Sequence, residues 1–192
     1  MLGSVPYDCR MARIFVSGTW RPDRAEPHRA DALRLGARIA ARGFDLVCGP
    51  GTGIARHVID GYRSVQPRGL VRYVLPRREL MDEVGEIAEP GHDELEQTEF
   101  DYPMRNVWQV SQCDGLVVLT GGDGALEEIL PALIDYQIPV GIVRESGPAA
   151  IAVARLLDLF PEWSELTVFG DSATDLIDEL LDRVALGKKP GG

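Results

Sequence analysis

Apolar residues follow two alternating patterns along the chain. Short runs such as Gly115 to Leu119 are apolar throughout, which predicts parallel strands that are covered on both faces. Between such runs, apolar residues recur at helical spacing, and after residue 122 this stripe consists of Leu126, Ile129, Leu130, Leu133 and Ile134. The alternation predicts a single Rossmann-like, doubly wound α/β domain with a mostly parallel sheet over residues 13–185.

The remaining elements continue the alternation. Strands are expected at residues 14–16, 45–48, 69–75, 115–119 and 140–143, with a final edge strand at 166–169. Helices are expected at about 27–42, from 54, at 78–88, 102–112 and 148–159, and after a cap at Asp171 and Ser172. Residues 22–27 and the remainder of 77–100 are expected to be loops, and residues 1–12 and 186–192 to be flexible termini.

Two of these helices have a predicted buried face. The helix at 27–42 is expected to bury Ala30, Leu33, Ala37 and Ala40. The last helix is expected to bury Leu176, Ile177, Leu180, Leu181 and Val184.

Three glycine-containing loops follow predicted strands, at residues 17–19, 49–53 and 120–124. Because the carboxyl ends of parallel strands meet at one edge of a sheet, we expect the loops to converge on one ligand. The third loop opens a helix, whose first N–H groups lack intrahelical partners and carry partial positive charge. That arrangement favours a bound phosphate.

Each of these motifs also has a structural interpretation. The loop at 49–53 reads GxGxG rather than GxGxxG, so a tight strand-to-helix turn and a phosphate contact are both open. Strand 69–75 ends without an acidic residue, which disfavours NAD, and neither GxxxxGK[ST] nor GxSxG occurs. Glu127 and Glu128 either complement the helix dipole or contact a ligand, and their position beside the third loop favours a ligand.

Composition excludes several classes of function. The formal charge of -10 disfavours nucleic-acid binding, and no apolar run approaches the ~18 residues that cross a bilayer. The lysines, Lys188 and Lys189, both lie in the last few residues, which excludes Schiff-base chemistry. Three cysteines without CxxC spacing favour a reducing, cytoplasmic compartment, and the scattered histidines predict no metal site.

The segments MRN at 104–106 and SQCDGLVVLTGGDGALEEI at 111–129 resemble the Lonely-guy family of nucleoside 5′-monophosphate phosphoribohydrolases, long mislabelled lysine decarboxylases. The family pattern has an arginine in MxxRK followed, fifteen residues later, by PGGxGTxxE, which aligns Arg105, Thr120 and Glu128. The segments at 16–19, 46–53 and 69–76 also resemble the family. Thr120, Ala125 and Asn106 replace proline, threonine and lysine, as in a divergent branch that includes molybdenum-cofactor carriers and nucleotide-sensing modules.

The resemblance implies that the chain hydrolyses a nucleoside monophosphate to free base and ribose 5-phosphate, without metal or cofactor. It implies catalytic roles for Arg105, Glu128 and Glu127 and a phosphate site at Gly121, Gly122, Asp123, Gly124 and Ala125. The remaining predicted nucleotide-binding residues are Ser17, Gly18, Thr19, Gly49, Gly51, Thr52, Gly53, Met104 and Thr120.

The predicted partner is therefore a small-molecule nucleotide, with no nucleic acid and no membrane, and a homodimer is expected because resembling proteins pair through helices beside the site. Two other functions remain open. One is a non-catalytic carrier or sensor of a nucleotide or cofactor, and the other is a deoxyribosyltransferase-like enzyme that passes the sugar to an acceptor.

Overall fold

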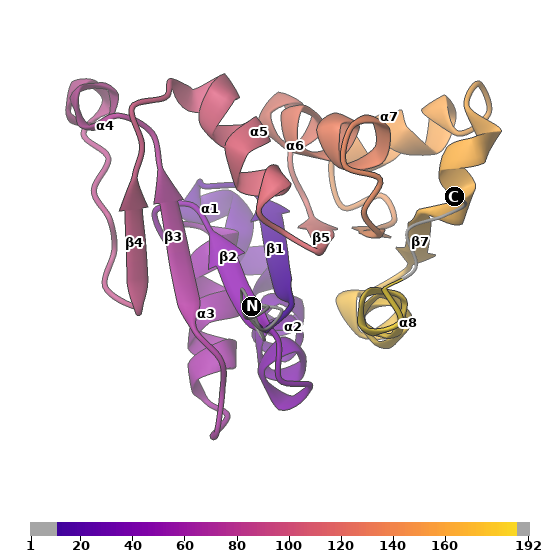
Figure 1. The fold of residues 1–192 in the computed structure, drawn as a ribbon, viewed down its shortest axis with the longest axis horizontal. Coiled ribbons are helices and arrows are strands. Elements are labelled where there is room, and N and C mark those ends of the chain that lie inside the picture. Colours follow the sequence, from indigo (N-terminus) through magenta and orange to yellow (C-terminus); the bar gives the residue numbers. More distant parts are fainter. Residues whose placement is uncertain (1–10, 188–192) are drawn as a thin grey trace, which may run out of the picture.

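A seven-stranded sheet forms the centre of the computed structural model, which describes residues 11–187 (Figure 1). Its strands are β1 (Arg13–Gly18), β2 (Asp45–Cys48), β3 (Val71–Leu75), β4 (Glu94–Gln97), β5 (Gly115–Leu119), β6 (Val140–Val143) and β7 (Thr167–Gly170). They lie in the order β4-β3-β2-β1-β5-β6-β7, and every adjacent pair is parallel. The predicted Rossmann-like, doubly wound architecture is confirmed.

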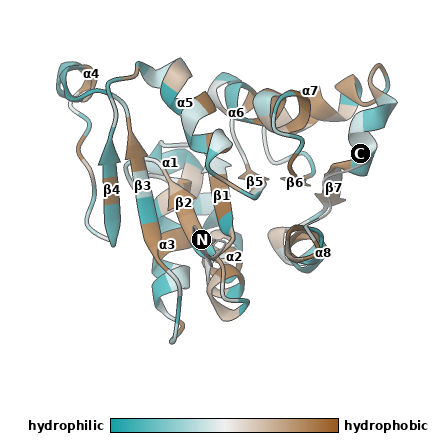
Figure 2. Cartoon of the chain, in the orientation of Figure 1, coloured by the Kyte–Doolittle hydropathy of each residue, from teal (hydrophilic) through white to brown (hydrophobic). Residues whose placement is uncertain are grey.

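Helices cover both faces of the sheet. The elements are α1 (Pro22–Ala25), η1 (Glu26–His28), α2 (Arg29–Ala41), α3 (Ile54–Arg63), α4 (Arg78–Val84), α5 (Tyr102–Ser111), α6 (Asp123–Ile134), α7 (Pro148–Leu156), η2 (Pro161–Glu165) and α8 (Ala173–Ala185). Helices α2, α3 and α8 share one apolar core with the sheet, and α5, α6 and α7 share a second core on the opposite face (Figure 1). The central strands are predominantly hydrophobic (Figure 2).

Strand residues divide between these two cores by alternation. Ile14 and Val16 belong to the core on the α2 side, whereas Phe15 between them belongs to the core on the α5 side. This explains why the central strands are apolar at nearly every position: a parallel strand with helices on both faces buries each side chain in turn.

The last helix agrees with its predicted pattern. All five residues of its expected stripe are buried. The expected cap is Ser172, whose hydroxyl accepts a hydrogen bond from the backbone N–H of Asp175 at 3.3 Å, while the Asp175 carboxylate accepts from the N–H of Ser172 at 2.9 Å. This reciprocal capping box satisfies N–H groups that the first helical turn leaves unpaired.

The buried face predicted for α2 is wrong at three of its four positions. Ala40 is buried as predicted, but Ala30 is exposed and Leu33 and Ala37 are half-buried. The other buried residues of α2 are Ala32, Leu35, Gly36 and Ile39. The cause is close packing against α3 at a glycine. A Cβ on Gly36 would lie 1.9 Å from the carbonyl oxygen of Val58. Because α2 has apolar residues on more than one side, this glycine contact determines which side faces the core.

The segment before α2 is also more ordered than predicted. Residues 22–28 were expected to be largely loop, but they form the short helix α1 and the 3-10 turn η1. The two prolines, Pro22 and Pro27, each lie in the first turn of a short helical element, where their missing N–H group costs nothing.

The edge strand β4 was not predicted, because residues 94–97 were assigned to a loop. The strand pairs with β3 in the register Tyr73↔Leu95, and Arg72 on β3 contacts Glu96 at 2.5 Å. Its sequence, ELEQ, is polar because an edge strand exposes most of its side chains. Strand β4 is held by backbone pairing to β3 and by the cross-strand ion pair. Neither interaction requires apolar residues, so the sequence shows no hydrophobic pattern here.

Most of the predicted flexible termini lie outside the described residues, since the structure describes neither residues 1–10 nor 188–192. Within residues 11–187, no helix has both the length and the apolar character needed to cross a membrane.

The sheet order places two glycine loops next to each other. Strand β1 lies between β2 and β5, which is where the direction of winding reverses. Gly18, at the end of β1, is in register with Leu119, at the end of β5. The loops that follow these two residues therefore leave the sheet side by side, and the cavity described below opens between them.

Candidate functional site

A cavity of about 900 Å³ lies at the carboxyl ends of β1, β2 and β5. Its wall includes residues from all three predicted glycine loops, which therefore converge. Further wall residues come from positions 20–24, from the end of α4 and the residues that follow it up to 89, and from the first turns of α5 and α6. The volume is within the range of about 300–1,000 Å³ that is usual for small-molecule sites.

Glu128 is the buried carboxylate of this cavity. It lies on α6, is only 9% exposed, and accepts a short hydrogen bond from the hydroxyl of Ser17 at the end of β1. Burial raises the pKa of Glu128 to about 7, although the Ser17 hydroxyl and the charge of Arg105 favour the ionised form. The carboxylate therefore titrates near neutral pH, which is unusual for a glutamate and common at catalytic sites.

Arg105 is the buried cation of the same cavity. It lies on α5, is 8% exposed, and its Nη1 donates to Oε1 of Gln109 at 2.8 Å and to the carbonyl oxygen of Val74 at 3.5 Å. Burial lowers the pKa of Arg105, and the charge of Glu128 opposes that effect. No ion pair within 4.0 Å involves Arg105 among the described residues, so its Nη2 donors remain for a ligand.

Gly49 makes room for this guanidinium. A Cβ at Gly49 would lie 3.1 Å from Nη1 of Arg105, which is closer than an ordinary van der Waals contact. The first glycine of the GxGxG loop thus contributes to the site by allowing the close approach of a side chain from α5.

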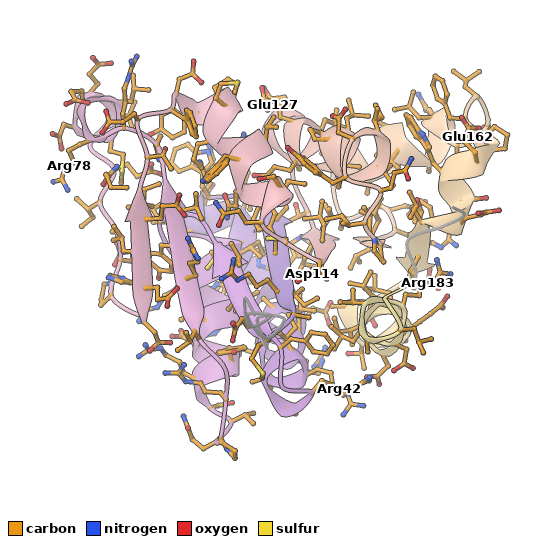
Figure 3. The ribbon with its side chains drawn as sticks, viewed as in Figure 1. Arg42, Arg78, Asp114, Glu127, Glu162 and Arg183 are labelled. Carbon is orange, nitrogen blue, oxygen red and sulfur yellow. The ribbon has the colours of Figure 1, made fainter. Side chains whose placement is uncertain are left out.

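Glu127 has a different environment from its neighbour Glu128. It is exposed at the junction of α5 and α6 (Figure 3) and accepts a hydrogen bond from Nδ2 of Asn106 at 2.9 Å. Asn106 is the residue that replaces lysine in the family pattern, so here a neutral amide holds this carboxylate. Within residues 11–187, no three His, Cys, Asp or Glu side chains come together as a group that could hold a metal ion.

The loop after β5 leaves the first N–H groups of α6 available. Gly122 is the N-cap residue, and no side chain caps the helix. Gly121 adopts a φ of 143°, and a Cβ on Gly122 or Gly124 would meet nothing within 4 Å. A helix terminus with uncapped amides and open space in front of it is suited to an anion.

The residues after β6 form hydrogen bonds to the glycine loop after β5. The N–H of Thr120 donates to the hydroxyl of Ser146 at 3.0 Å, and the N–H of Ala149 donates to the carbonyl of Gly121 at 3.2 Å. Thr120 itself has a φ of 67°, in the left-handed region that a branched residue rarely adopts. Proline, which the family pattern has here, is fixed near −65° and has no N–H. With Thr120 in place of proline, the loop therefore has a backbone conformation that proline could not adopt.

The structure brings most of the predicted site residues into one cavity wall. These residues are Ser17, Gly18, Thr19, Gly49, Thr52, Arg105, Gly121, Gly122, Asp123, Gly124, Ala125, Glu127 and Glu128. Gly51 and Gly53 line a smaller neighbouring cavity of about 410 Å³. A Cβ on Gly53 would lie 2.1 Å from the carbonyl oxygen of Thr19, as a tight strand-to-helix turn requires. Met104 is 53% exposed, and neither it nor Thr120 lines the cavity.

Several wall residues were not identified from the sequence. They are Trp20, Arg21 and Arg24 after the first loop, Tyr102 on α5, Val84 at the end of α4, and Glu86, Ile87 and Glu89 beyond it. Tyr102 was accessible to prediction, because it lies three residues before Arg105 and therefore on the same helix face. The segment 84–89 carries no motif, and only its position beside the sheet edge places it at the site.

Comparison with known proteins places this fold and site in one family. The family model for SLOG cluster 4 matches residues 13–158. The chain belongs to the SLOG cluster4 family. This confirms the resemblance recognised from the motifs, because relatives of this SLOG chain include phosphoribohydrolases of the Lonely-guy type.

Two such relatives come from rice, Oryza sativa subsp. japonica. The SLOG chain is 30% identical over 150 residues to a cytokinin riboside 5′-monophosphate phosphoribohydrolase, covering 72% of this chain and 57% of the relative. It is 27% identical over 151 residues to a probable enzyme of the same name, covering 72% of this chain and 56% of the relative. The chain thus spans little more than half the length of these curated relatives.

Solved structures share the fold. The Moco carrier protein from Chlamydomonas reinhardtii superposes with a TM-score of 0.73 at 22% identity, covering 93% of this chain and 100% of that protein. The molybdenum cofactor binding protein from Rippkaea orientalis gives 0.71 at 21% identity, covering 93% and 99%. DNA processing protein A from Helicobacter pylori gives 0.59 at 16% identity, covering 89% and 80%. At these identities, the likeness concerns the fold alone.

The positive φ of Thr120 leads to a prediction about the stability of the loop after β5. We expect Thr120→Gly to raise the free energy of unfolding by about 1 kcal/mol, because glycine adopts a positive φ without steric cost. Thr120→Pro should lower it by about 3 kcal/mol, because proline cannot adopt this φ and cannot donate to Ser146. Urea denaturation measures both, with Thr120→Ala as the control for loss of the side chain. A Thr120→Pro variant as stable as the wild type would contradict the left-handed backbone conformation of Thr120.

Proposed function

We propose that this protein hydrolyses the N-glycosidic bond of a nucleoside 5′-monophosphate and releases free base and ribose 5-phosphate. The observation that carries the proposal is the placement of buried Glu128 and buried Arg105 in one cavity that ends at the uncapped N-terminus of α6. The names of the phosphoribohydrolase relatives support it. The proposed reaction needs no metal and no cofactor, and we propose that it takes place in the cytoplasm.

The phosphate positions the substrate in this scheme. The N–H groups at the start of α6 hold the 5′-phosphate, and the ribose then lies over Glu128, one turn further along the helix. Because the phosphate is bound at a distance from the reacting bond, its binding energy holds the sugar in the orientation that the reaction needs. Glu127, at the rim of the cavity, accepts hydrogen bonds from ribose hydroxyls.

Glu128 acts on the reacting carbon in its ionised form. Cleavage of the C1′–N bond leaves the bonding electrons on the base and develops positive charge on the sugar, which a nearby carboxylate stabilises. Water adds to C1′ and transfers a proton to Glu128, and a proton is returned to the departing base. A carboxylate with a pKa of about 7 suits this exchange, because neither its protonated nor its ionised form is strongly favoured at neutral pH.

Arg105 complements the carboxylate. Its Nη1 is held by Gln109 and Val74, which fixes the plane of the guanidinium and leaves Nη2 to donate to the ribose or to the departing base. Arginine remains charged at physiological pH, so it assists the leaving group by hydrogen bonding and by charge rather than by giving up a proton.

Variants of the two adjacent glutamates test these roles. We expect Glu128→Gln to lower kcat about 10³-fold while changing the Kd for AMP little, because the amide keeps the shape but not the charge. Glu127→Gln is the matched control, since it removes the same charge from the rim, and it should retain most of the activity. The assay incubates each protein with AMP, GMP, CMP and UMP and measures free base and ribose 5-phosphate by chromatography.

The outcomes of that assay separate the alternatives. Full activity in the Glu128→Gln variant would exclude the mechanism. Binding of a monophosphate without any cleavage by the wild type would favour a carrier or sensor. Release of base only when an acceptor base is added would identify a transferase.

The pH dependence of kcat/KM follows from the raised pKa of Glu128. Because the ionised carboxylate is the reactive form, activity should rise with pH through about 7. Ser17→Ala removes a hydrogen bond that stabilises the carboxylate, so the pKa should increase and the midpoint of the profile should move about one pH unit higher. A profile that falls through neutral pH, or one unmoved by Ser17→Ala, would contradict this role.

We further propose that two copies pair through the helices on the α5 side of the sheet. Exposed apolar side chains lie along this layer: Met104 is 53% exposed, Trp108 40%, Ile134 52% and Ile151 45%. Exposed apolar residues grouped in this way are typical of interfaces. Sedimentation should give a dimer for the wild type and a monomer for Met104→Glu combined with Ile134→Glu. A wild-type monomer at micromolar concentration would refute the pairing.

A further inference from the structure

Two arginines in the cavity wall form no ion pair within the part of the chain that the structure describes. Arg21 and Arg24 follow the first glycine loop and line the same cavity as Glu128. Most other arginines between residues 11 and 187 contact a carboxylate, as Arg38 contacts Asp178 at 2.6 Å. In a chain with a formal charge of -10, arginines that remain unpaired beside a cavity are the exception.

The sheet brings these arginines to the phosphate loop. Gly18 and Leu119 are in register at the ends of β1 and β5, so Arg21 and Gly122 each lie three residues beyond paired positions. The loops are in close contact, since a Cβ on Gly121 would lie 4.0 Å from the Cα of Gly18. Arg21, Arg24 and the start of α6 therefore line adjacent parts of one cavity.

Two carboxylates near the start of α6 oppose the binding of a phosphate there. The first turn of α6 contains Asp123, and the exposed Glu127 follows one turn later. These carboxylates repel a dianionic phosphate at the uncapped amides of the helix. Arg105, the other arginine of the cavity wall, is buried beside Glu128 at the sugar end. Among the described residues that line the cavity, Arg21 and Arg24 are the other positively charged side chains.

The backbone holds the first of these arginines in place. The N–H of Ala25 donates to the carbonyl of Arg21 at 3.0 Å, and Pro22 fixes the turn that follows. The guanidinium carbon of Arg21 lies 5.5 Å from the centre of the Trp20 ring. A cation held over an aromatic ring keeps its edge free to donate to an anion.

We propose that Arg21 and Arg24 form the second half of the phosphate site. The N–H groups of α6 bind the 5′-phosphate of the ligand from one side, and the two guanidinium groups bind it from the side of the β1–α1 loop. We call these two arginines the clamp. The clamp makes the protein select nucleotides over nucleosides, and it supplies the contacts that the alanine at position 125 cannot make. For the identity of the ligand, the inference rests on the proposed function.

Binding of AMP and adenosine tests the clamp. Titration calorimetry is carried out in the Glu128→Gln background, so that no ligand is consumed. We expect Arg21→Ala with Arg24→Ala to weaken AMP binding at least tenfold and to leave adenosine binding unchanged. The affinity for AMP should also become less sensitive to salt, because two charge contacts are lost. Ribose 5-phosphate, titrated into the same arginine variants with Glu128 intact, provides a second measurement.

Two control variants accompany the test. Arg155→Ala removes an equal charge from an exposed arginine on α7 that also forms no ion pair among the described residues and lies outside the cavity. It should bind AMP like the parent protein. Replacement of both clamp arginines by lysine should restore part of the affinity, because lysine keeps the charge but loses the bidentate geometry.

The results that overturn the clamp differ from those that overturn the hydrolase. Unchanged AMP affinity in the arginine variant, or an equal loss for AMP and adenosine, refutes the clamp even if the wild type cleaves AMP. Failure of the wild type to release base from any monophosphate refutes the hydrolase, whereas a selective loss of AMP and ribose 5-phosphate binding still supports the clamp. Circular dichroism of each variant verifies that the fold is retained.

Discussion

The parallel pairing of β1 with β5 is the constraint on which the rest of the site depends. It joins two segments that are far apart in the sequence and aligns Gly18 with Leu119, so that their loops leave the sheet together. Ser17 and Glu128, separated by 111 positions, meet in a hydrogen bond only because of this pairing. Because the direction of winding reverses at β1, no crossover helix covers the space beyond the carboxyl ends of β1 and β5, and a cavity results.

The site that this pairing creates has an energetic cost. An unfolded glutamate ionises with a pKa near 4.5, whereas burial raises the pKa of Glu128 to about 7. Between those values, the folded chain binds a proton that the unfolded chain has lost, so the native state loses stability as the pH rises through this window. Ser17 and Arg105 reduce this cost without removing it. The fold therefore keeps the Glu128 carboxylate buried at a cost in stability above pH 4.5.

The sequence predicts the parts of this protein in which a single local pattern dominates. Apolar runs identify the central strands, because helices on both faces leave no polar positions. The stripe and cap of α8 are predicted because Ser172 and five apolar residues act within one helix. The convergence of the glycine loops is predictable as well, since it follows from parallel strands alone.

What the sequence does not predict depends on contacts between distant residues. The orientation of α2 is set by the contact of Gly36 with α3, and β4 exists through pairing with β3 rather than through its own polar residues. Arg21 and Arg24 resemble any exposed arginines in the sequence, and only the fold brings them into the same cavity wall as the start of α6. The family motif does not predict the backbone conformation of Thr120 for a related reason. The N–H of Thr120 donates to the hydroxyl of Ser146, which lies in another loop.

The part of the cavity wall formed by residues 84–89 differs from the part formed by the glycine loops. This segment runs from the last residue of the short helix α4 toward the edge strand β4, and Val84 and Ile87 in it are 67% and 60% exposed although they line the cavity. Tyr102 connects it to α5 through a hydrogen bond to Glu86 at 2.9 Å. Within the same segment, Ala88 packs against the core on the α2 side, and the charge of Glu86 acts on Arg105. The exposed side chains of Val84 and Ile87 belong to neither core, so the shape of this side of the cavity is separable from the packing that holds Arg105 and Glu128.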